Sequence, residues 1–201
     1  MTPRAATRAR PRRRLYGLLI FAAVAVGIVA FVVPMVDRAV KEVTLPLRHE
    51  DIIRQQARDK GLSPALVAAV IYAESKFRDE TSPTGAKGLM QIQPETAKFI
   101  AQRSGGSAFQ VADLASPQIN IQYGTWYLRY LLRQHSGNVV LAVASYNAGE
   151  TNVAHWVERS READKAFRIK DIPFPETRSY VQRVLEAERD YRREYTRELG
   201  L

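Results

Sequence analysis

One glutamate lies where a carboxyl group can exchange protons. Segment 65–77 reads ALVAAVIYAESKF, in which Glu74 follows Val70 by four positions and Ile71 by three. This spacing puts the three side chains on one face of a helix, so the carboxyl group shares an apolar surface. Burial disfavours a charged carboxylate and lets it hold a proton at neutral pH. Glu74 is therefore a candidate general acid, although the pattern also fits a structural glutamate bound to a basic core partner.

Helix start signals predict the elements that would position Glu74. The pair Ser63-Pro64 supplies an N-cap and a proline at the first helical position. The pair Ser116-Pro117 repeats this arrangement, and Pro94 begins a further helix. The alternation typical of strands is nearly absent. The sequence therefore predicts an all-α, or strongly α-dominated, domain.

The remainder of the chain continues this helical pattern. The apolar run 139–148 predicts a helix that Gly149 ends in a left-handed conformation, and the turn formers of segment 82–88 predict a loop between two helices. A last helix begins near Glu176, and beyond about Arg189 its charge density predicts a solvated tail. One face of this last helix carries an apolar stripe that fits core packing, formed by Tyr180, Val184, Ala187, Tyr191 and Tyr195.

The first 36 residues differ in kind from the rest. Six arginines, with no acidic residue, precede an uncharged run over residues 15–36, LYGLLIFAAVAVGIVAFVVPMV. At about 1.5 Å per residue this run spans a hydrocarbon core of roughly 30 Å, so it predicts a single transmembrane helix. The basic flank predicts a cytoplasmic N-terminus and an extracytoplasmic domain. A cleaved signal peptide is the alternative, although its apolar run would usually be shorter and followed by a small-residue cleavage site.

The chain thus divides into a basic cytoplasmic tail (1–14), a transmembrane helix (15–36), a tether (37–48) and a folded domain (49–201). The formal net charge is +9, but beyond the six arginines 24 basic side chains face 21 acidic ones. The excess charge belongs to the tail, which orients the helix and touches anionic lipid headgroups. A nucleic-acid partner is therefore not expected.

Several kinds of chemistry are excluded by composition. The chain has no cysteine, which rules out disulfides, thiolate metal sites, a cysteine nucleophile and a lipidated cysteine. The three histidines, His49, His135 and His155, are widely separated and lack the spacing of metal ligands. We expect no metal and no cofactor.

Four motifs in order resemble the soluble lytic transglycosylase family. They are ESKF at 74–77, GAKGLMQIQP at 85–94, ASYNAG at 144–149 and ETRSYV at 176–181, and together they cover about residues 50–190. The resemblance implies a lysozyme-like catalytic domain, here preceded by a single N-terminal transmembrane helix. It also makes Glu74 the expected catalytic acid and base.

The resemblance implies cleavage of the β-1,4 bond between N-acetylmuramic acid and N-acetylglucosamine without water. Glu74 would protonate the leaving oxygen and then, as a carboxylate, remove the proton of the muramoyl C6 hydroxyl as that oxygen closes on the anomeric carbon. The product carries a 1,6-anhydro ring. Most glycosidases use a pair of carboxyl groups, whereas a reaction in which the substrate supplies the nucleophile needs no second one. The nearby acidic residues Asp79 and Glu80 are read as solvated loop residues.

The resemblance also implies substrate-binding residues around Glu74: Ser75, Gly88, Met90, Gln91, Tyr146, Asn147, Glu176 and Tyr180. Ser75 can bond the carboxyl group or a substrate acetyl group, or only its own helix backbone. Gly88 permits a close approach of the backbone. Met90 and Gln91 would line the groove through apolar contact and amide hydrogen bonds, while the intervening Leu89 belongs to the core.

The later motifs supply the other side of the expected groove. Tyr146 can offer its ring to a pyranose, and Asn147 can bond acetamido groups or close its own helix. Glu176 can favour positive charge at the anomeric centre or can meet the dipole of its helix. Tyr180 can donate a hydrogen bond to the catalytic carboxyl group and also pack in the core.

Two other functions are compatible with the sequence. A hydrolytic, lysozyme-like muramidase would keep the fold and the acid but use water, and a wall tether would hold glycan strands without cutting them. In each case the partners are peptidoglycan strands and, through residues 15–36, membrane lipid. Proteins of bacterial cell-wall synthesis or division are a further class of partner.

Overall fold

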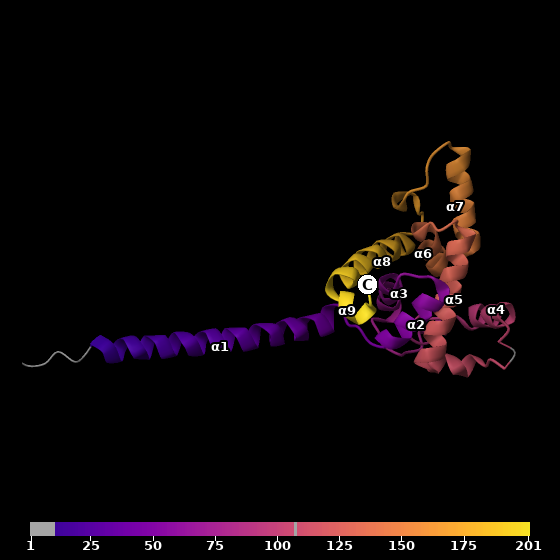
Figure 1. The fold of residues 1–201 in the computed structure, drawn as a ribbon. Coiled ribbons are helices and arrows are strands. Elements are labelled where there is room, and N and C mark those ends of the chain that lie inside the picture. The colour runs from indigo at the N-terminus through magenta and orange to yellow at the C-terminus, as the bar shows by residue number, and fades with distance from the viewer. Residues whose placement is uncertain (1–10, 107) are drawn as a thin grey trace, which may run out of the picture. The chain divides into compact units, whose positions relative to one another are not determined.

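The computed structural model describes residues 11–201 except residue 107, and Figure 1 shows their fold. The chain forms two compact units, residues 1–44 and residues 45–201. The described part of the first is the helix α1 (Pro11–Thr44), which continues through most of the tether predicted at 37–48. Most of the predicted basic tail, residues 1–10, lies outside the described residues, as do several side chains of α1. Among the residues described, no helix is both long and apolar enough to cross a membrane.

The second unit is built from helices and short connecting turns, as the sequence predicts. Its α-helices, with two short 3-10 helices between them, are α2 (Glu50–Lys60), α3 (Pro64–Ser75), α4 (Pro94–Ser104), η1 (Val111–Ala115), α5 (Pro117–Gln134), α6 (Val139–Ala148), α7 (Glu150–Glu162), η2 (Ile169–Asp171), α8 (Pro175–Glu194) and α9 (Thr196–Leu199). Within the described part of this unit, extended pairing is limited to two isolated bridges.

The central helix of the second unit is α3, which packs most extensively on α8 (Figure 1). Seven consecutive residues of α3, from Ala65 to Ile71, are at most 3% exposed. A helix that is apolar on every side must be buried on every side, which explains why other helices surround it. The Ser63 hydroxyl accepts a hydrogen bond from the Leu66 amide at 3.3 Å, so the predicted N-cap is confirmed. Ser116 also holds an N-cap position, although its side chain makes no capping hydrogen bond.

The turn-rich segment after α3 forms the predicted loop. Lys87 pairs with Thr81 on one side and with Ile92 on the other, so the loop folds back on itself twice. The buried side chains Leu89 and Met90 anchor it in the core, at 1% and 0% exposure. This anchored loop lies in sequence between Glu74 and α4.

Two predictions about helix ends were wrong. Gly149 has a φ of 84° but a ψ of 150°, so it is not in the left-handed helical conformation; it links α6 directly to α7. The chain beyond Arg189 is not a solvated tail, because Tyr191 and Leu199 are 0% and 1% exposed. The Tyr191 hydroxyl donates to the Pro46 carbonyl at 2.5 Å, and α9 contacts α2. A few apolar residues among many charges are enough to pack this segment, because Tyr191 and Leu199 both face the core.

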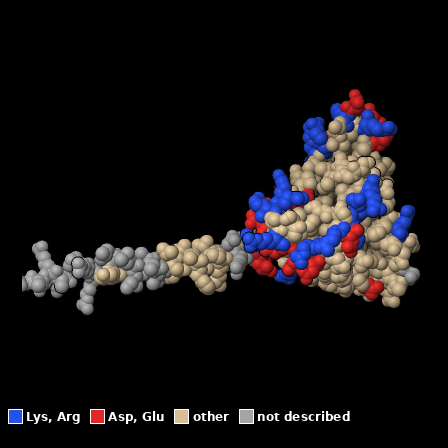
Figure 2. All heavy atoms as spheres, in the orientation of Figure 1, with Lys and Arg blue, Asp and Glu red and all other residues tan. Residues whose placement is uncertain are grey.

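The surface charges of the second unit are mixed. On the face drawn in Figure 2, basic and acidic side chains are interspersed over the helices, with broad uncharged areas between them. This distribution agrees with the near balance of charge outside the N-terminal arginines.

Candidate active site

Glu74 lies in the last turn of α3, where the helix stops abruptly. Lys76 and Phe77 both have positive φ, 53° and 61°, so the backbone turns away immediately after the glutamate. The glutamate side chain is partly buried. Its Oε1 accepts a hydrogen bond from the Tyr180 hydroxyl of α8 at 2.6 Å. The most extensive helix–helix contact of the domain, α3 on α8, thus holds the carboxyl group against its donor.

Burial raises the pKa of Glu74 from its ordinary 4.5 to about 7. The Tyr180 hydrogen bond and the charge of Arg183 act in the opposite direction, because both favour the carboxylate. The carboxyl group therefore holds its proton near neutral pH and still has partners that stabilise it after the proton leaves. This combination suits a group that must act first as an acid and then as a base.

Tyr146 of α6 lies beside the same carboxyl group. Burial and the nearby Glu74 charge raise the pKa of Tyr146 well above 10, so the phenol stays neutral. Its hydroxyl donates to the Met90 carbonyl at 2.9 Å, and its ring packs against Tyr127 with centroids 5.5 Å apart. Tyr146 thus joins α6 to the anchored loop at the edge of the Glu74 site.

Ser75 and Met90 support the loop from inside the core. The Ser75 hydroxyl is 2% exposed and lies 2.7 Å from the Leu89 carbonyl and 3.2 Å from the Ile71 carbonyl, both acceptors. Met90 is fully buried, and its sulfur lies so close to Gly124 that a Cβ there would stand 2.3 Å away. The predicted groove-lining role of the Met90 side chain is therefore wrong, because the residue faces the core.

The Gly88 backbone is held against a residue that sequence reasoning did not identify. Asn120 of α5 accepts from the Met90 amide at 2.8 Å and donates to the carbonyls of Lys87 and Leu114 at 2.9 and 3.0 Å. Gly88 has a φ of 72°, and a Cβ there would stand 2.2 Å from the Asn120 amide. The close approach predicted for Gly88 thus occurs, but toward Asn120. No local pattern marks an asparagine inside a helix for this task.

Gln91 closes the same loop with its amide group. Its Nε2 donates to the carbonyls of Glu80 and Gly88 at 2.9 and 2.8 Å. Glu80 and Asp79 are exposed, as expected of loop residues, and Glu80 pairs with Arg78 at 3.3 Å. The Gln91 amide nitrogen therefore shapes the loop.

The ASYNAG and ETRSYV motifs meet where α6 ends and α8 begins. The Thr177 hydroxyl donates to the Asn147 amide oxygen at 2.7 Å, which leaves Asn147 exposed and oriented. Glu176 is exposed in the first turn of α8, where its charge also meets the positive end of the helix dipole. Both remain accessible to a ligand.

Arg183 is a residue of the site that the sequence did not reveal. It lies one turn after Tyr180 on α8, with its guanidinium carbon 6.0 Å from the centre of the Tyr180 ring. Its charge lowers the pKa of Glu74. The signal that could have found it is the three-residue spacing from Tyr180, but many charged residues of α8 share such spacing.

The described residues contain no group of three or more histidine and acidic side chains that could hold a metal ion. His135 instead lies 2.8 Å from the Ser145 hydroxyl through its Nε2. The groups available for chemistry at this site are the protonated carboxyl group of Glu74, the neutral phenols of two tyrosines and the guanidinium group of Arg183.

A family model described as "Transglycosylase SLT domain" matches residues 51–169, more than half of the chain. The chain belongs to this family. The SLT domain therefore contains Glu74 and the loop and α6 motifs, and α8 with Tyr180 follows the matched region.

Curated relatives extend the match through most of the second unit. The soluble lytic murein transglycosylase of Salmonella typhimurium is 36% identical over 159 residues, and that of Escherichia coli strain K12 is 34% identical over 154. Each alignment covers 75% of this chain but 24% of the relative. The chain with its SLT domain thus spans about a quarter of the length of these relatives.

Solved structures share the fold of the SLT domain. An inactive glutamate-to-glutamine mutant of the lytic transglycosylase Slt from Pseudomonas aeruginosa superposes with a TM-score of 0.70 at 34% identity, over 78% of this chain and 26% of that one. The 70 kDa soluble lytic transglycosylase of Escherichia coli has the same TM-score at 33% identity, over 76% and 25%. A further structure of the 70 kDa soluble lytic transglycosylase contains bulgecin A.

Proposed function

We propose that this protein is a peptidoglycan lytic transglycosylase in which Glu74 is the catalytic acid and base. The observation that carries the proposal is the environment of this carboxyl group. Burial raises its pKa to about 7, and Tyr180 donates to it at 2.6 Å. Family membership and the names of the relatives support the same activity.

The reaction proceeds in two proton transfers through one carboxyl group. Protonated Glu74 gives its proton to the glycosidic oxygen as the bond from that oxygen to the anomeric carbon breaks. The resulting carboxylate then accepts the proton of the muramoyl C6 hydroxyl as the C6 oxygen bonds to the anomeric carbon. Glu74 ends in its starting state. A second carboxyl group is not needed, because the substrate itself supplies the nucleophile.

The remaining predicted residues divide into two roles. Tyr146, Asn147 and Glu176 contact the sugar rings or their substituents, because they edge the site with exposed or partly exposed groups. Tyr180 orients the Glu74 carboxyl group. The other four shape the loop between α3 and α4 from within: Ser75, Gly88, Met90 and Gln91.

The protein is further proposed to be a single-pass membrane protein with its N-terminus in the cytoplasm. Residues 15–36 carry no charge, and six arginines precede them. The described apolar side chains of α1 support this reading, since Phe21, Phe31 and Met35 are 73%, 74% and 65% exposed. In this arrangement the catalytic domain works on the wall outside the membrane, where wall-synthesis or division proteins are available as partners.

Product analysis tests the enzymatic proposal. The full chain in detergent micelles is incubated with purified peptidoglycan, and the released fragments are identified by mass spectrometry. Anhydro-muropeptides are expected. Fragments with reducing ends would instead establish a hydrolytic muramidase, and intact sacculi with bound protein would establish a wall tether.

Protease protection tests the anchor. Intact cells and inverted membrane vesicles are treated with protease, and the second unit is followed with an antibody. The second unit is expected to be digested only in the preparation in which the outer face of the membrane is accessible to the protease, and to be protected in the other. Release of the protein into the soluble fraction by high salt would contradict a spanning helix.

A further inference from the structure

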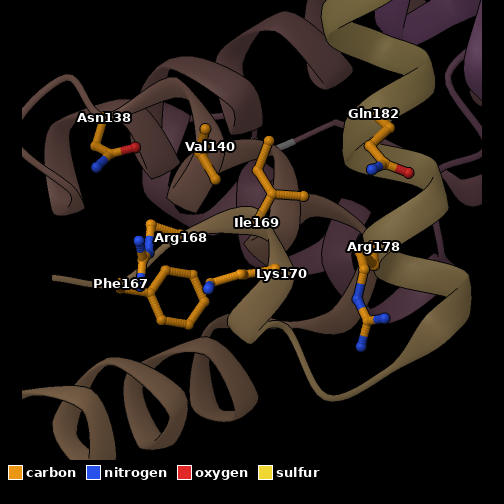
Figure 3. Close-up of a pocket in the computed structure, with 8 residues that line it drawn as sticks. All are labelled: Asn138, Val140, Phe167, Arg168, Ile169, Lys170, Arg178 and Gln182. Atoms are coloured by element: carbon orange, nitrogen blue, oxygen red, sulfur yellow. The ribbon is translucent and has the colours of Figure 1, made fainter. Parts of the chain in front are cut away.

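A separate cavity lies between the start of α6, the segment before α8 and one face of α8. Its volume is about 570 Å³, within the range of small-ligand sites. Figure 3 shows the side chains that line it: Asn138, Val140, Phe167, Arg168, Ile169, Lys170, Arg178 and Gln182. Arg178 and Gln182 stand two residues before and after Tyr180, which at 100° per residue puts them on the other side of α8 from the catalytic carboxyl group. The cavity is therefore distinct from the Glu74 site.

The lining of this cavity is basic. It contains Arg168, Lys170 and Arg178, and none of its lining residues is acidic. Arg178 is held in place because its Nε and Nη2 donate to the Ile172 carbonyl at 3.2 and 2.7 Å. Asp171, which is not one of the lining residues, accepts from the Arg168 amide at 2.9 Å and lies 3.8 Å from the Arg168 Nε. The lining residues themselves therefore carry a net positive charge.

The first turn of α6 adds to this positive field. Asn138 caps the helix by accepting from the Leu141 amide at 3.2 Å, and both Asn138 and Val140 line the cavity. The first amides of a helix have no partner within it and carry a partial positive charge. A ligand with carboxylate groups would meet the three cationic side chains in a cavity that the start of α6 helps to line.

The apolar and amide groups of the cavity indicate which class of ligand fits it. Val140, Phe167 and Ile169 give aliphatic and aromatic contact surface, while Asn138 and Gln182 offer amides that can bond a peptide backbone. Cations, apolar patches and amides together match a short peptide with carboxylates and aliphatic side chains. An uncharged sugar would bring no negative charge to this basic lining.

We propose that this cavity binds the carboxylate-bearing peptide stem of peptidoglycan while Glu74 acts on the glycan strand, an inference that rests on the proposed function. The distance between the two ends of α6 can be compared with the length of a peptide stem. Asn147 stands at the sugar-binding edge and Asn138 at the cavity, nine residues apart, which is about 13–14 Å along the helix axis. An extended stem of four residues reaches about as far. Arg178 of the ETRSYV motif thereby acquires a role on the face of α8 opposite Tyr180.

The test compares two doubly substituted full-length proteins in detergent micelles. Arg168→Ala with Lys170→Ala removes two cations from the cavity. The control, Arg159→Ala with Lys165→Ala, removes two exposed cations that line a separate 270 Å³ cavity. With peptide-bearing strands, the cavity variant is expected to raise KM about 10-fold at unchanged kcat. With strands stripped of their stems, both variants should match the parent protein.

A binding measurement separates this proposal from the catalytic one. Titration calorimetry of each full-length protein with the tetrapeptide L-Ala-γ-D-Glu-diaminopimelate-D-Ala should show affinity that the cavity variant loses about 10-fold and the control keeps. Absence of tetrapeptide binding, or equal binding by all three proteins, overturns the stem site even if the enzyme cleaves glycan. Loss of tetrapeptide binding in the cavity variant, without cleavage by any protein, keeps the stem site and overturns the transglycosylase proposal.

Charge-preserving and membrane controls complete the test. Arg168→Lys with Lys170→Arg should restore both KM and tetrapeptide affinity, because the proposal depends on charge. Vesicles containing anionic lipid serve as the competing ligand. If the vesicles bind the cavity variant more weakly than the parent protein, while the tetrapeptide binds both equally, the cavity is a lipid site and the stem proposal is overturned.

Discussion

The two ends of α8 use buried tyrosines in different ways. Near its start, Tyr180 donates to the Glu74 carboxyl group at 2.6 Å. Near its end, Tyr191 donates to the Pro46 carbonyl at 2.5 Å, and just beyond it Tyr195 donates to the Leu45 carbonyl at 2.8 Å. All three hydroxyls sit on one apolar stripe, yet one serves a titrating group and two fasten the backbone at the start of the domain.

The partner of each tyrosine hydroxyl, and not the tyrosine itself, decides whether the residue serves function or stability. A backbone carbonyl cannot change its charge, so Tyr191 and Tyr195 contribute to stability alone. A carboxyl group with a pKa near 7 changes charge in the working range, so Tyr180 also sets when that change occurs. The same three- and four-residue spacing continues along the whole stripe. The two ends differ only in the segment of the chain that packs against them.

The largest expected effect comes from removing the titrating group. Glu74→Gln keeps an oxygen for Tyr180 but cannot give or take the proton, so turnover should fall by about 10³-fold or more. Release of anhydro products measures it, and sedimentation with sacculi should show unchanged binding. Turnover near the parent value would remove Glu74 from the mechanism and with it the contrast between the two ends.

The same variant, although inactive, should be more stable than the parent protein at alkaline pH. The folded state raises the Glu74 pKa from 4.5 to about 7, so it holds a proton that the unfolded chain has lost, and stability declines as pH rises through this window. Glu74→Gln should therefore be more stable than the parent protein by about 1–3 kcal/mol at pH 8, with little difference at pH 4.5. Chemical denaturation at both pH values measures this. Equal differences at both would mean that Glu74 is not desolvated.

At the far end of α8, Tyr191→Phe should affect stability alone. It leaves the Pro46 carbonyl without its donor in a buried place, and the free energy of unfolding should fall by about 1–3 kcal/mol. Denaturant midpoints measure the loss, and kcat should match the parent protein. A large fall in kcat at unchanged stability would show that the two ends are functionally coupled.

Tyr180→Phe should instead move the pH dependence of activity. The lost hydrogen bond favours the carboxylate, so the pKa of Glu74 should rise further and the alkaline limb of the kcat profile should shift to higher pH. We expect kcat to fall about 10-fold at the optimum, because the carboxyl group is no longer oriented. A profile that keeps its shape and position would assign Tyr180 to packing, like its neighbours on the stripe.

The smallest effect is expected for Tyr195→Phe. This side chain is partly buried, so water can reach the Leu45 carbonyl when the hydroxyl is removed. The free energy of unfolding should fall by about 0.5–1 kcal/mol with no change in the kcat profile. A loss as large as that of Tyr191→Phe would show that the domain start is clamped equally at both positions.

Features that depend on the local chain were predictable from the sequence. The Ser63 cap, the helix that it begins and the place of Glu74 on that helix follow from residue types and spacing. The contact between Tyr180 and Glu74 joins residues 106 positions apart, and it was expected only through the family resemblance. Periodicity alone favoured a structural glutamate bound to a core partner over a catalytic one.

Features that depend on which way a loop or helix faces were not predictable. Met90 stands in a motif expected to line the groove, yet its side chain enters a space left open by Gly124, more than thirty positions later in the sequence. Asn120 satisfies two backbone groups of the loop and one of η1 without any local signature. The packed end of α8 was missed because its many charges dominate the composition, whereas a few apolar side chains decide the packing.

The order in which the chain is synthesised gives the α3–α8 contact a further consequence. Glu74 leaves the ribosome more than a hundred residues before Tyr180, and the two can meet only when the last long helix docks on α3. An incomplete chain therefore contains the acid without the hydroxyl that orients it. A site assembled from an early helix and a late one stays unfinished until synthesis of the domain is nearly complete, so truncated products lack the completed site.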